Sequence, residues 1–258
     1  LGLGRGDGCF ETLRVLVEDG GRWVHGWDAH LDRFERSAAA LDLPRPDRTA
    51  WAVLAEELLA AAAPGESALK LVLTRGLPGT GEPTGLATLT PVPAGLLRQR
   101  EAGISVVTLS RGTPVDAHAR APWLLGGVKT LSYAVHTAAL REAGRRGADD
   151  ALFVSTDGFA LEGPTATLLW WARGTLRTTP PGATGILAGT TQEALFAAAA
   201  AEGVAVEPAL AQVGDLLAAD GVWFASSVRG VVEVVSLDGR ELPREPGLTA
   251  DWQRLAGF

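Results

Sequence analysis

Apolar and polar residues alternate along several short stretches in the first half of the chain, which is the pattern of strands with one buried face. The first stretch follows a run of glycines, and a glycine pair that suits a turn comes after it. The predicted strands cover residues 9–17, 23–27, 69–73, 87–93 and 104–109. Such a series of short strands predicts a sheet.

Apolar residues recur every three or four positions between these strands, which predicts two helices. The first covers residues 29–41 behind Asp28, and the second covers residues 48–63 behind Asp47, since an aspartate can cap a helix. Arg33 lies off the apolar side of the first helix. That side consists of Leu31, Phe34, Ala38 and Leu41. The pattern predicts an α+β domain with its helices on one face.

The second half of the chain continues with both kinds of pattern. A helix is predicted over residues 132–146, and a tight turn at residues 157–158. Thr190 and Glu193 have the T-x-x-E spacing of a capping box, at the start of a helix that ends at Gly203. The predicted strands cover residues 151–156, 159–162, 167–172, 175–179, 222–225 and 231–235.

A stretch without periodicity, around residues 110–122, separates the two halves and is predicted to be a linker. The domains expected from it are an N-terminal α+β domain at 1–112, a linker at 113–121 and a C-terminal domain at 122–258. A chain of 258 residues is long enough for two modest hydrophobic cores.

Composition excludes several classes of function. A net charge of −7 argues against nucleic-acid and anionic-membrane partners, which require a basic face. The four histidines lack metal-ligand spacing, so no metal is expected. Cys9 is the single cysteine, which precludes an internal disulfide and suits a reducing, cytoplasmic compartment.

Lys129 is the residue that points most directly to chemistry. The chain otherwise favours arginine for positive charge, and Lys129 follows the glycine pair at 126–127. Arginine stays protonated, whereas a desolvated lysine can lose its proton and form a Schiff base. Tyr133 is the only tyrosine of the chain, and Glu162 stands at a predicted strand end before Gly163.

These residues resemble motifs of the class IV aminotransferases, pyridoxal-phosphate enzymes of fold type IV. The resemblance rests on Lys129, on the Glu162-Gly163 pair 33 residues later, and on G-D-G-x-F-E-T-x-R at 6–14. It implies a two-domain enzyme with a small α+β N-terminal domain and a larger pseudo-barrel C-terminal domain that binds pyridoxal 5'-phosphate. It also implies a homodimer.

The resemblance further implies which residues contact this cofactor. Lys129 would bind the cofactor aldehyde, Glu162 would pair with the pyridine nitrogen, and Tyr133 would hydrogen-bond the ring hydroxyl. An anion at the pyridine nitrogen keeps the ring protonated, so that the ring can accept electrons. The residues implied at the cofactor phosphate are Arg33, Gly189, Thr190, Thr191 and Ser227.

Thr12 indicates which activity of this family to expect. Threonine at this place is typical of the branch with 4-amino-4-deoxychorismate lyase activity, which forms 4-aminobenzoate and pyruvate for folate biosynthesis. Lys129 and Thr12 are therefore the implied catalytic residues, acting on a small amino substrate. Further substrate contacts are expected from Arg14, Trp123 and Ser226.

Two alternatives to the lyase stay open. One is a branched-chain or D-amino-acid aminotransferase of the same fold, and the other is a non-catalytic protein that binds a small anion. Lys129, Tyr133 and Glu162 together argue against the second. The family usually has serine and asparagine after its E-G pair, where this chain has Pro164, Thr165, Ala166 and Thr167. This difference leaves the choice of substrate open.

Overall fold

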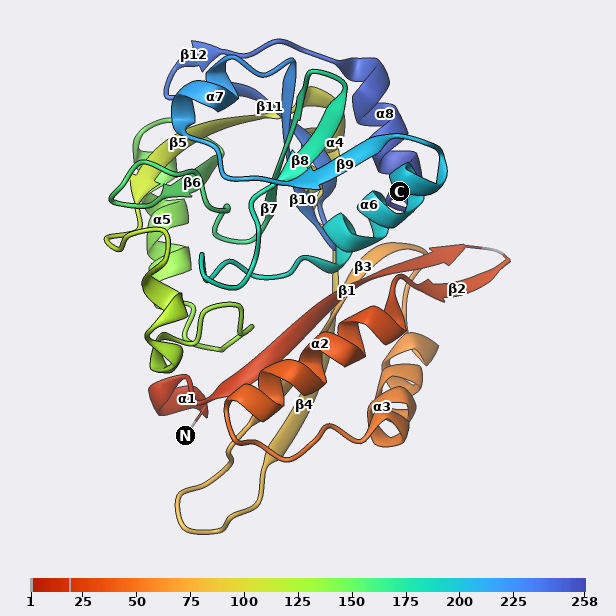
Figure 1. The fold of residues 1–258 in the computed structure, drawn as a ribbon. Coiled ribbons are helices and arrows are strands. Elements are labelled where there is room, and N and C mark those ends of the chain that lie inside the picture. The colour runs from red at the N-terminus through yellow and green to blue at the C-terminus, as the bar shows by residue number, and fades with distance from the viewer. Residues whose placement is uncertain (1, 19) are drawn as a thin grey trace. The chain divides into compact units, whose positions relative to one another are not determined.

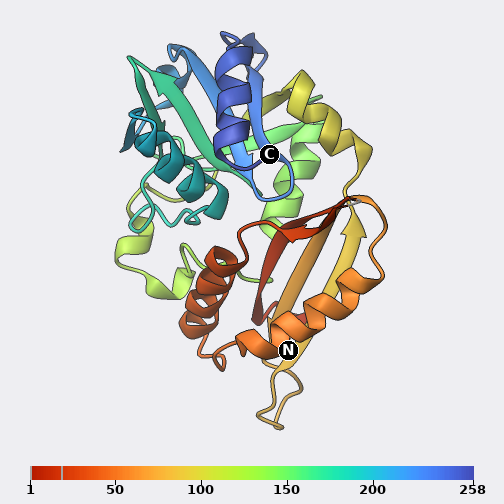
Figure 2. The ribbon, with the colours of Figure 1, turned by 90° about the vertical axis from the view of Figure 1, so that its right-hand side faces the viewer.

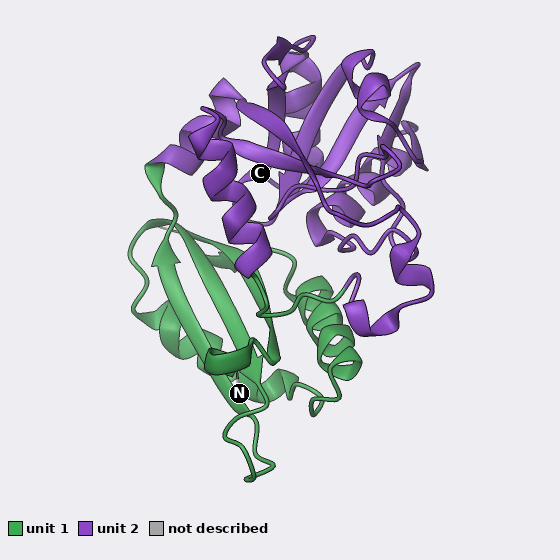
Figure 3. Cartoon of the chain, turned by 90° about the vertical axis from the view of Figure 1, so that its left-hand side faces the viewer, with its two compact units in different colours: residues 1–94, 128–133 green, residues 95–127, 134–258 purple. Residues whose placement is uncertain are grey.

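A computed structural model describes residues 2–18 and 20–258 of the chain. The chain forms two compact units (Figure 3). Unit 1 contains residues 1–94 and 128–133, and unit 2 contains residues 95–127 and 134–258. The segment that carries Lys129 therefore belongs to unit 1, although it lies far along the chain from the rest of that unit.

Unit 1 is built on a four-stranded antiparallel sheet in the order β2-β1-β3-β4. Helices α2 and α3 lie along this sheet (Figure 1), as a second view also shows (Figure 2). The strands are β1 (Gly8–Glu18), β2 (Gly21–Val24), β3 (Gly65–Thr74) and β4 (Thr84–Pro91), and the helices are α1 (Gly2–Arg5), α2 (Trp27–Ala40) and α3 (Arg48–Ala60).

The core of unit 1 follows the alternation predicted for its first strand. Cys9, Leu13 and Val15 of β1 point toward the helices and are fully buried. Leu31, Phe34 and Ala38 pack against them from α2, which confirms most of the predicted apolar side. Phe10, Thr12 and Arg14 alternate with the core residues and therefore lie on the opposite face of the sheet. The Nζ atom of Lys129 lies over the ring of Phe10, which belongs to this face.

Unit 2 is built on an eight-stranded mixed sheet, in the order β6-β5-β11-β10-β7-β8-β9 with β12 beside β11. Its strands are β5 (Ile104–Ser110), β6 (Asp150–Val154), β7 (Thr167–Ala172), β8 (Thr175–Thr178), β9 (Ala205–Pro208), β10 (Gly221–Ser226), β11 (Gly230–Leu237) and β12 (Arg240–Glu241). Its helices are α4 (Ala94–Ala102), α5 (Ala134–Arg145), α6 (Thr190–Ala201), α7 (Val213–Leu217) and α8 (Pro246–Leu255), with 3₁₀ turns at Ala117–Ala119 and Pro122–Leu124. No described helix has both the length and the apolar character needed to cross a membrane.

The division into units differs from the predicted boundary at residue 112. Helix α4 and strand β5 belong to unit 2, because β5 pairs in parallel with β11 and β6. The sequence did not predict α4, which buries none of its residues and so has no apolar side to detect. The return strand predicted at 159–162 forms only isolated bridges, one of them between Val154 and Ala160.

Two of the three predicted helix caps are wrong. Asp28 lies inside the first turn of α2, and Gly26 precedes the helix with a φ of 65°. Gly189 is the residue that precedes α6, so Thr190 is already the first residue inside the helix. Asp47 does cap α3, since its side chain accepts hydrogen bonds from the backbone amides of residues 49 and 50.

Candidate functional site

The backbone around Lys129 is held by β1 and α2. The amide of Phe10 donates to the carbonyl of Lys129 at 3.1 Å, and the amide of Leu131 donates to the carbonyl of Gly8 at 2.8 Å. The amide of Lys129 itself donates to the hydroxyl of Ser37 on α2 at 3.2 Å. These bonds fix the lysine on unit 1 by its main chain.

The side chain of Lys129 lies over an aromatic ring. Its Nζ atom is 4.6 Å from the ring centroid of Phe10 and 5.9 Å from that of Tyr133. The two rings meet edge to face, with their centroids 5.2 Å apart. The structure thus brings together Lys129 and Tyr133, which the sequence singled out, and adds Phe10, which the sequence analysis missed.

A second lysine lies at the same ring and was also missed. The Nζ atom of Lys70 is 4.6 Å from the centroid of Phe10. Lys70 on β3 is the register partner of Thr12 on β1, so the two side chains are neighbours on one face of the sheet. The scarcity of lysine in the chain is the signal that could have drawn attention to Lys70.

Arg33 is buried rather than solvent-exposed, which corrects its placement off the buried side of α2. The reason is Glu11, a fully buried carboxylate that points from β1 toward α2. Nε of Arg33 donates to Glu11 at 2.8 Å and Nη2 donates to it at 2.7 Å, while Nδ1 of His30 lies 2.6 Å from Oε2 of Glu11. The carboxylate therefore fixes the plane of the guanidinium.

Burial and hydrogen bonding act in opposite directions on this cluster. Burial alone would raise the pKa of Glu11, but the hydrogen bonds from Arg33 and His30 outweigh it and lower that pKa to about 2. Burial lowers the pKa of His30, against the opposing effect of Glu11. Burial, reinforced by the charge of Glu11, raises the pKa of Cys9 to about 12. At neutral pH the cluster is thus a carboxylate–guanidinium pair beside a neutral imidazole and a neutral thiol.

Glu162 is held in unit 2 by its main chain and its carboxylate. The backbone amide of Leu187 donates to Oε2 of Glu162 at 3.1 Å, and Nη1 of Arg111 lies 3.5 Å from Oε1. Gly163 follows with its α-carbon against Phe224, where a β-carbon would come within 2.8 Å of the ring. The residue pair from the E-G motif is therefore packed tightly, and Arg111 is a charged neighbour that the sequence analysis missed.

Several of the residues predicted to contact the cofactor phosphate lie at or near the start of α6. Oγ1 of Thr190 lies 3.4 Å from Oγ of Ser227, which follows β10. Oγ1 of Thr191 is buried and has no hydrogen-bond partner among the described residues. Gly189 passes so close to Thr167 that a β-carbon would come within 2.2 Å of the threonine hydroxyl. A helix N-terminus with an unpartnered buried hydroxyl suits a bound anion.

The other predicted substrate residues, Arg14, Trp123 and Ser226, lie on three different elements. Nε and Nη2 of Arg14 donate to Glu66 at 2.7 and 3.0 Å. Trp123 is 75% exposed in a 3₁₀ turn of unit 2. Ser226 is the last residue of β10 and precedes Ser227.

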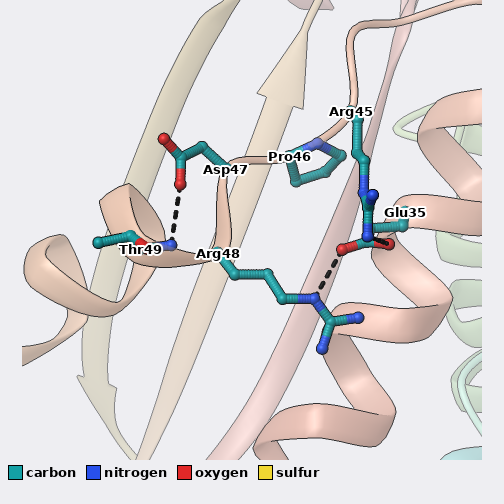
Figure 4. Close-up of a pocket in the computed structure, with 6 residues that line it drawn as sticks. All are labelled: Glu35, Arg45, Pro46, Asp47, Arg48 and Thr49. Carbon is teal, nitrogen blue, oxygen red and sulfur yellow. Dashed lines mark hydrogen bonds and ion pairs between the residues drawn. The ribbon is translucent and has the colours of Figure 1, made fainter.

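An open hollow of about 340 Å³ lies elsewhere on unit 1, where α3 begins near α2 (Figure 4). Arg45 and Arg48 point toward Glu35 there, and both form ion pairs with it. None of the predicted site residues lines this hollow. Its arginines are paired with Glu35 and its Asp47 caps α3, so it is not the candidate site.

Known proteins resemble the chain over nearly its whole length. The sequence profile of the amino-transferase class IV family matches residues 8–237. A bifunctional aminodeoxychorismate lyase / D-amino acid transaminase of Mycobacterium tuberculosis is 43% identical over 251 residues, which is 94% of this chain and 86% of that protein.

Two solved structures extend this comparison to the fold. A hypothetical aminotransferase from Mycobacterium tuberculosis in its PLP-bound form has a TM-score of 0.93 and 42% identity, covering 99% of this chain and 89% of its own. A fold IV-transaminase from Curtobacterium pusillum, CpuTA1, has a TM-score of 0.90 and 44% identity, covering 100% of this chain and 89% of its own. The expected fold, a two-domain α+β enzyme of fold type IV, is confirmed.

Proposed function

Because the chain belongs to the class IV aminotransferase family of pyridoxal-phosphate enzymes, we propose that it is a 4-amino-4-deoxychorismate lyase. It would form 4-aminobenzoate and pyruvate for folate biosynthesis. The observation that carries the proposal is the place of Thr12. This hydroxyl lies two residues from Phe10 on the same face of β1, and Lys129 lies over the ring of Phe10. The similarity to a relative named as such a lyase supports the same activity.

Each unit, taken by itself, contains residues that suit pyridoxal phosphate. The buried, unpartnered hydroxyl of Thr191 at the start of a 12-residue helix suits the phosphate dianion. Thr190, Ser227 and the amides after Gly189 would donate further hydrogen bonds to it. Arg33, oriented by Glu11, would contribute a positive charge.

Glu162 and Tyr133 would hold the ring of the cofactor. The Glu162 carboxylate, fixed by the amide of Leu187, would accept a hydrogen bond from the protonated pyridine nitrogen. Tyr133, held edge to face against Phe10, would donate to the ring hydroxyl. When bound, the cofactor supplies an electron sink for negative charge at the substrate carbon that bears nitrogen.

Lys129 and Thr12 would move the protons. Lys129 would hold the cofactor aldehyde, and its Nζ in the neutral form would take the proton from the carbon that bears the substrate nitrogen. The hydroxyl of Thr12 guides a proton to the group that leaves as pyruvate. The ring of Phe10 is 7% exposed and lies 4.6 Å from the Nζ atom of Lys129. It would therefore exclude water from that side of the amine.

A substitution at Thr12 tests the lyase. Thr12→Val keeps the shape of a β-branched strand residue but removes the hydroxyl. We expect pyruvate release from aminodeoxychorismate to fall at least tenfold, because one proton-transfer group is lost. Transamination of amino acids, which needs no proton at this leaving group, should change much less. Equal loss of both activities, or of neither, would refute a proton-guiding role for Thr12.

The second candidate function is a D-amino-acid or branched-chain aminotransferase that uses the same lysine. The name of the Mycobacterium tuberculosis relative, which includes D-amino acid transaminase, favours the D-amino-acid form. Incubation with aminodeoxychorismate, and separately with pairs of amino acids and 2-oxo acids, distinguishes the two. Pyruvate and 4-aminobenzoate from the first substrate support the lyase, and turnover of the pairs alone supports the aminotransferase.

We propose in addition that the enzyme is a homodimer of the cytoplasm. The family resemblance supports the dimer, and the buried free thiol of Cys9 suits a reducing compartment. Sedimentation at micromolar concentration tests the dimer, and a single species of monomer mass would contradict it.

A further inference from the structure

The loop between β10 and β11 carries one of the residues proposed at the cofactor phosphate. Ser226 pairs with Gly230 across the hairpin, so residues 227–229 form the loop outside the ladder. The Oγ atom of Ser227, the first of them, lies 3.4 Å from Oγ1 of Thr190 at the start of α6. Contacts from outside the hairpin therefore help to set the position of the Ser227 hydroxyl.

Arg100 on α4 holds the main chain of this loop. Its Nε atom donates to the carbonyl of Arg229 at 2.9 Å, and its Nη2 atom donates to the carbonyl of Val228 at 2.7 Å. The donors of a guanidinium lie in one rigid plane, so two such bonds fix the direction of both carbonyls. These carbonyls belong to the two residues that follow Ser227.

Arg100 is itself held by residues at the end of the chain. Its Cζ atom lies 5.2 Å from the ring centroid of Phe258, and a β-carbon at Gly230 would come within 3.0 Å of the same ring. Nε2 of Gln253 on α8 donates to the carbonyls of Arg100 and Val231 at 3.1 and 3.0 Å. Helices α4 and α8 are therefore both tied to the β10–β11 hairpin.

A second anchor holds the same loop by a side chain. Nη2 of Arg229 donates to Oδ2 of Asp150, the first residue of β6, at 2.7 Å, and both side chains are buried. The loop that carries Ser227 is thus fixed by two of its carbonyls and by one of its side chains. None of Arg100, Asp150 and Arg229 is among the residues predicted for the site.

We propose that Arg100 is a positioning residue of the cofactor phosphate site. It acts through the loop rather than by contact with the phosphate. Its bonds to the loop carbonyls keep the hydroxyl of Ser227 next to that of Thr190, where one dianion can accept a hydrogen bond from both. The inference rests on the proposed role of Ser227 at the phosphate and adds a claim about a residue of α4.

The experiment measures how tightly apoenzyme variants bind pyridoxal phosphate and pyridoxal, which lacks the phosphate. Arg100→Met keeps an unbranched side chain against Phe258 but removes both donors. We expect its Kd for pyridoxal phosphate to rise roughly 5- to 10-fold, about the worth of one hydrogen bond, and its Kd for pyridoxal to stay within about twofold. Arg98→Met is the matched control, because it makes the same change at an exposed arginine of α4 and should alter neither Kd.

A double-mutant cycle separates positioning from a general effect on the fold. Ser227→Ala should by itself weaken binding of pyridoxal phosphate about tenfold. Arg100→Met should then weaken it by less than about a further twofold, because two residues that act through one contact are not additive. If Arg100→Met does not fold, Arg100→Lys takes its place in the cycle. Lysine cannot bridge both carbonyls from one plane, so the same direction of change is expected at about threefold.

The results distinguish this inference from the proposed function. Weaker binding in Ser227→Ala with normal binding in the Arg100 variant overturns the inference alone. An equal loss for pyridoxal phosphate and pyridoxal, or an Arg100 effect that is undiminished in Ser227→Ala, also overturns it. Normal binding of pyridoxal phosphate by Ser227→Ala would remove Ser227 from the proposed phosphate site, and the inference with it.

Discussion

Glu11→Gln is expected to destabilise the protein severely, although Glu11 is not a proposed catalytic residue. The Glu11 carboxylate is fully buried and accepts two hydrogen bonds from Arg33, which is itself 5% exposed. Glutamine preserves the size of the side chain but removes its charge. Arg33 would then be a buried cation without its counter-ion, and breaking a buried pair in this way typically costs about 3–5 kcal/mol.

The pKa of Glu11 gives a second route to the same magnitude. The pKa falls from an ordinary value of 4.5 to about 2 in the folded protein. That difference corresponds to roughly 3 kcal/mol of stability from the ionised carboxylate. Because the folded-state pKa is the lower one, this stability is fully present above pH 4.5 and is lost as the pH falls toward 2. At pH 3 linkage leaves about 1.4 kcal/mol of it.

The assay is urea denaturation of the wild type and Glu11→Gln between pH 7 and pH 3. We expect a difference in unfolding free energy of roughly 3 kcal/mol at pH 7 that shrinks to less than half of that at pH 3. Glu35→Gln is the control, since it removes a partly buried carboxylate from α2 whose partners Arg45 and Arg48 are more exposed than it is. Its effect should be much smaller. A Glu11→Gln effect no larger than that of Glu35→Gln, or one independent of pH, would refute the reasoning.

Two further predictions concern single side chains. Cys9 should react with a thiol reagent at pH 8 only after unfolding, because burial raises its pKa to about 12, and fast reaction of the native protein would be inconsistent with that burial. Thr191→Val should weaken cofactor binding about tenfold by losing one hydrogen bond to the phosphate, whereas Thr191→Ser should bind normally. Titration of apoenzyme by absorbance measures both affinities, and equal affinities for valine and serine would remove Thr191 from the proposed phosphate site.

The sequence predicted elements where burial follows a simple period. Strand β1 and helix α2 have alternating or helical apolar patterns, and both formed close to the predicted ranges. Helix α4 has no buried side, so periodicity could not reveal it. The predicted caps at Asp28 and Thr190 failed for the same reason. In both helices a glycine, Gly26 or Gly189, occupies the N-cap position, so the predicted residue lies inside the helix.

The site was predictable only in part for a different reason. Lys129, Tyr133 and Glu162 carry motifs that can be recognised from residue type and spacing. The burial of Arg33 depends on Glu11, and the position of Lys70 depends on the pairing of β1 with β3. Such contacts join residues that are distant in the sequence and follow from strand register, which no local pattern specifies.

The central claim is that Lys129 carries the cofactor, and it is tested most directly by locating the covalent bond. Borohydride treatment of the pyridoxal-phosphate-loaded enzyme reduces the carbon–nitrogen double bond to a stable link, and peptide mass mapping then identifies the modified lysine. With 2 lysines in the sequence, the result is unambiguous. We predict that the whole modification lies on Lys129 and disappears in Lys129→Ala. Modification of Lys70 instead, or of neither lysine, would contradict the account.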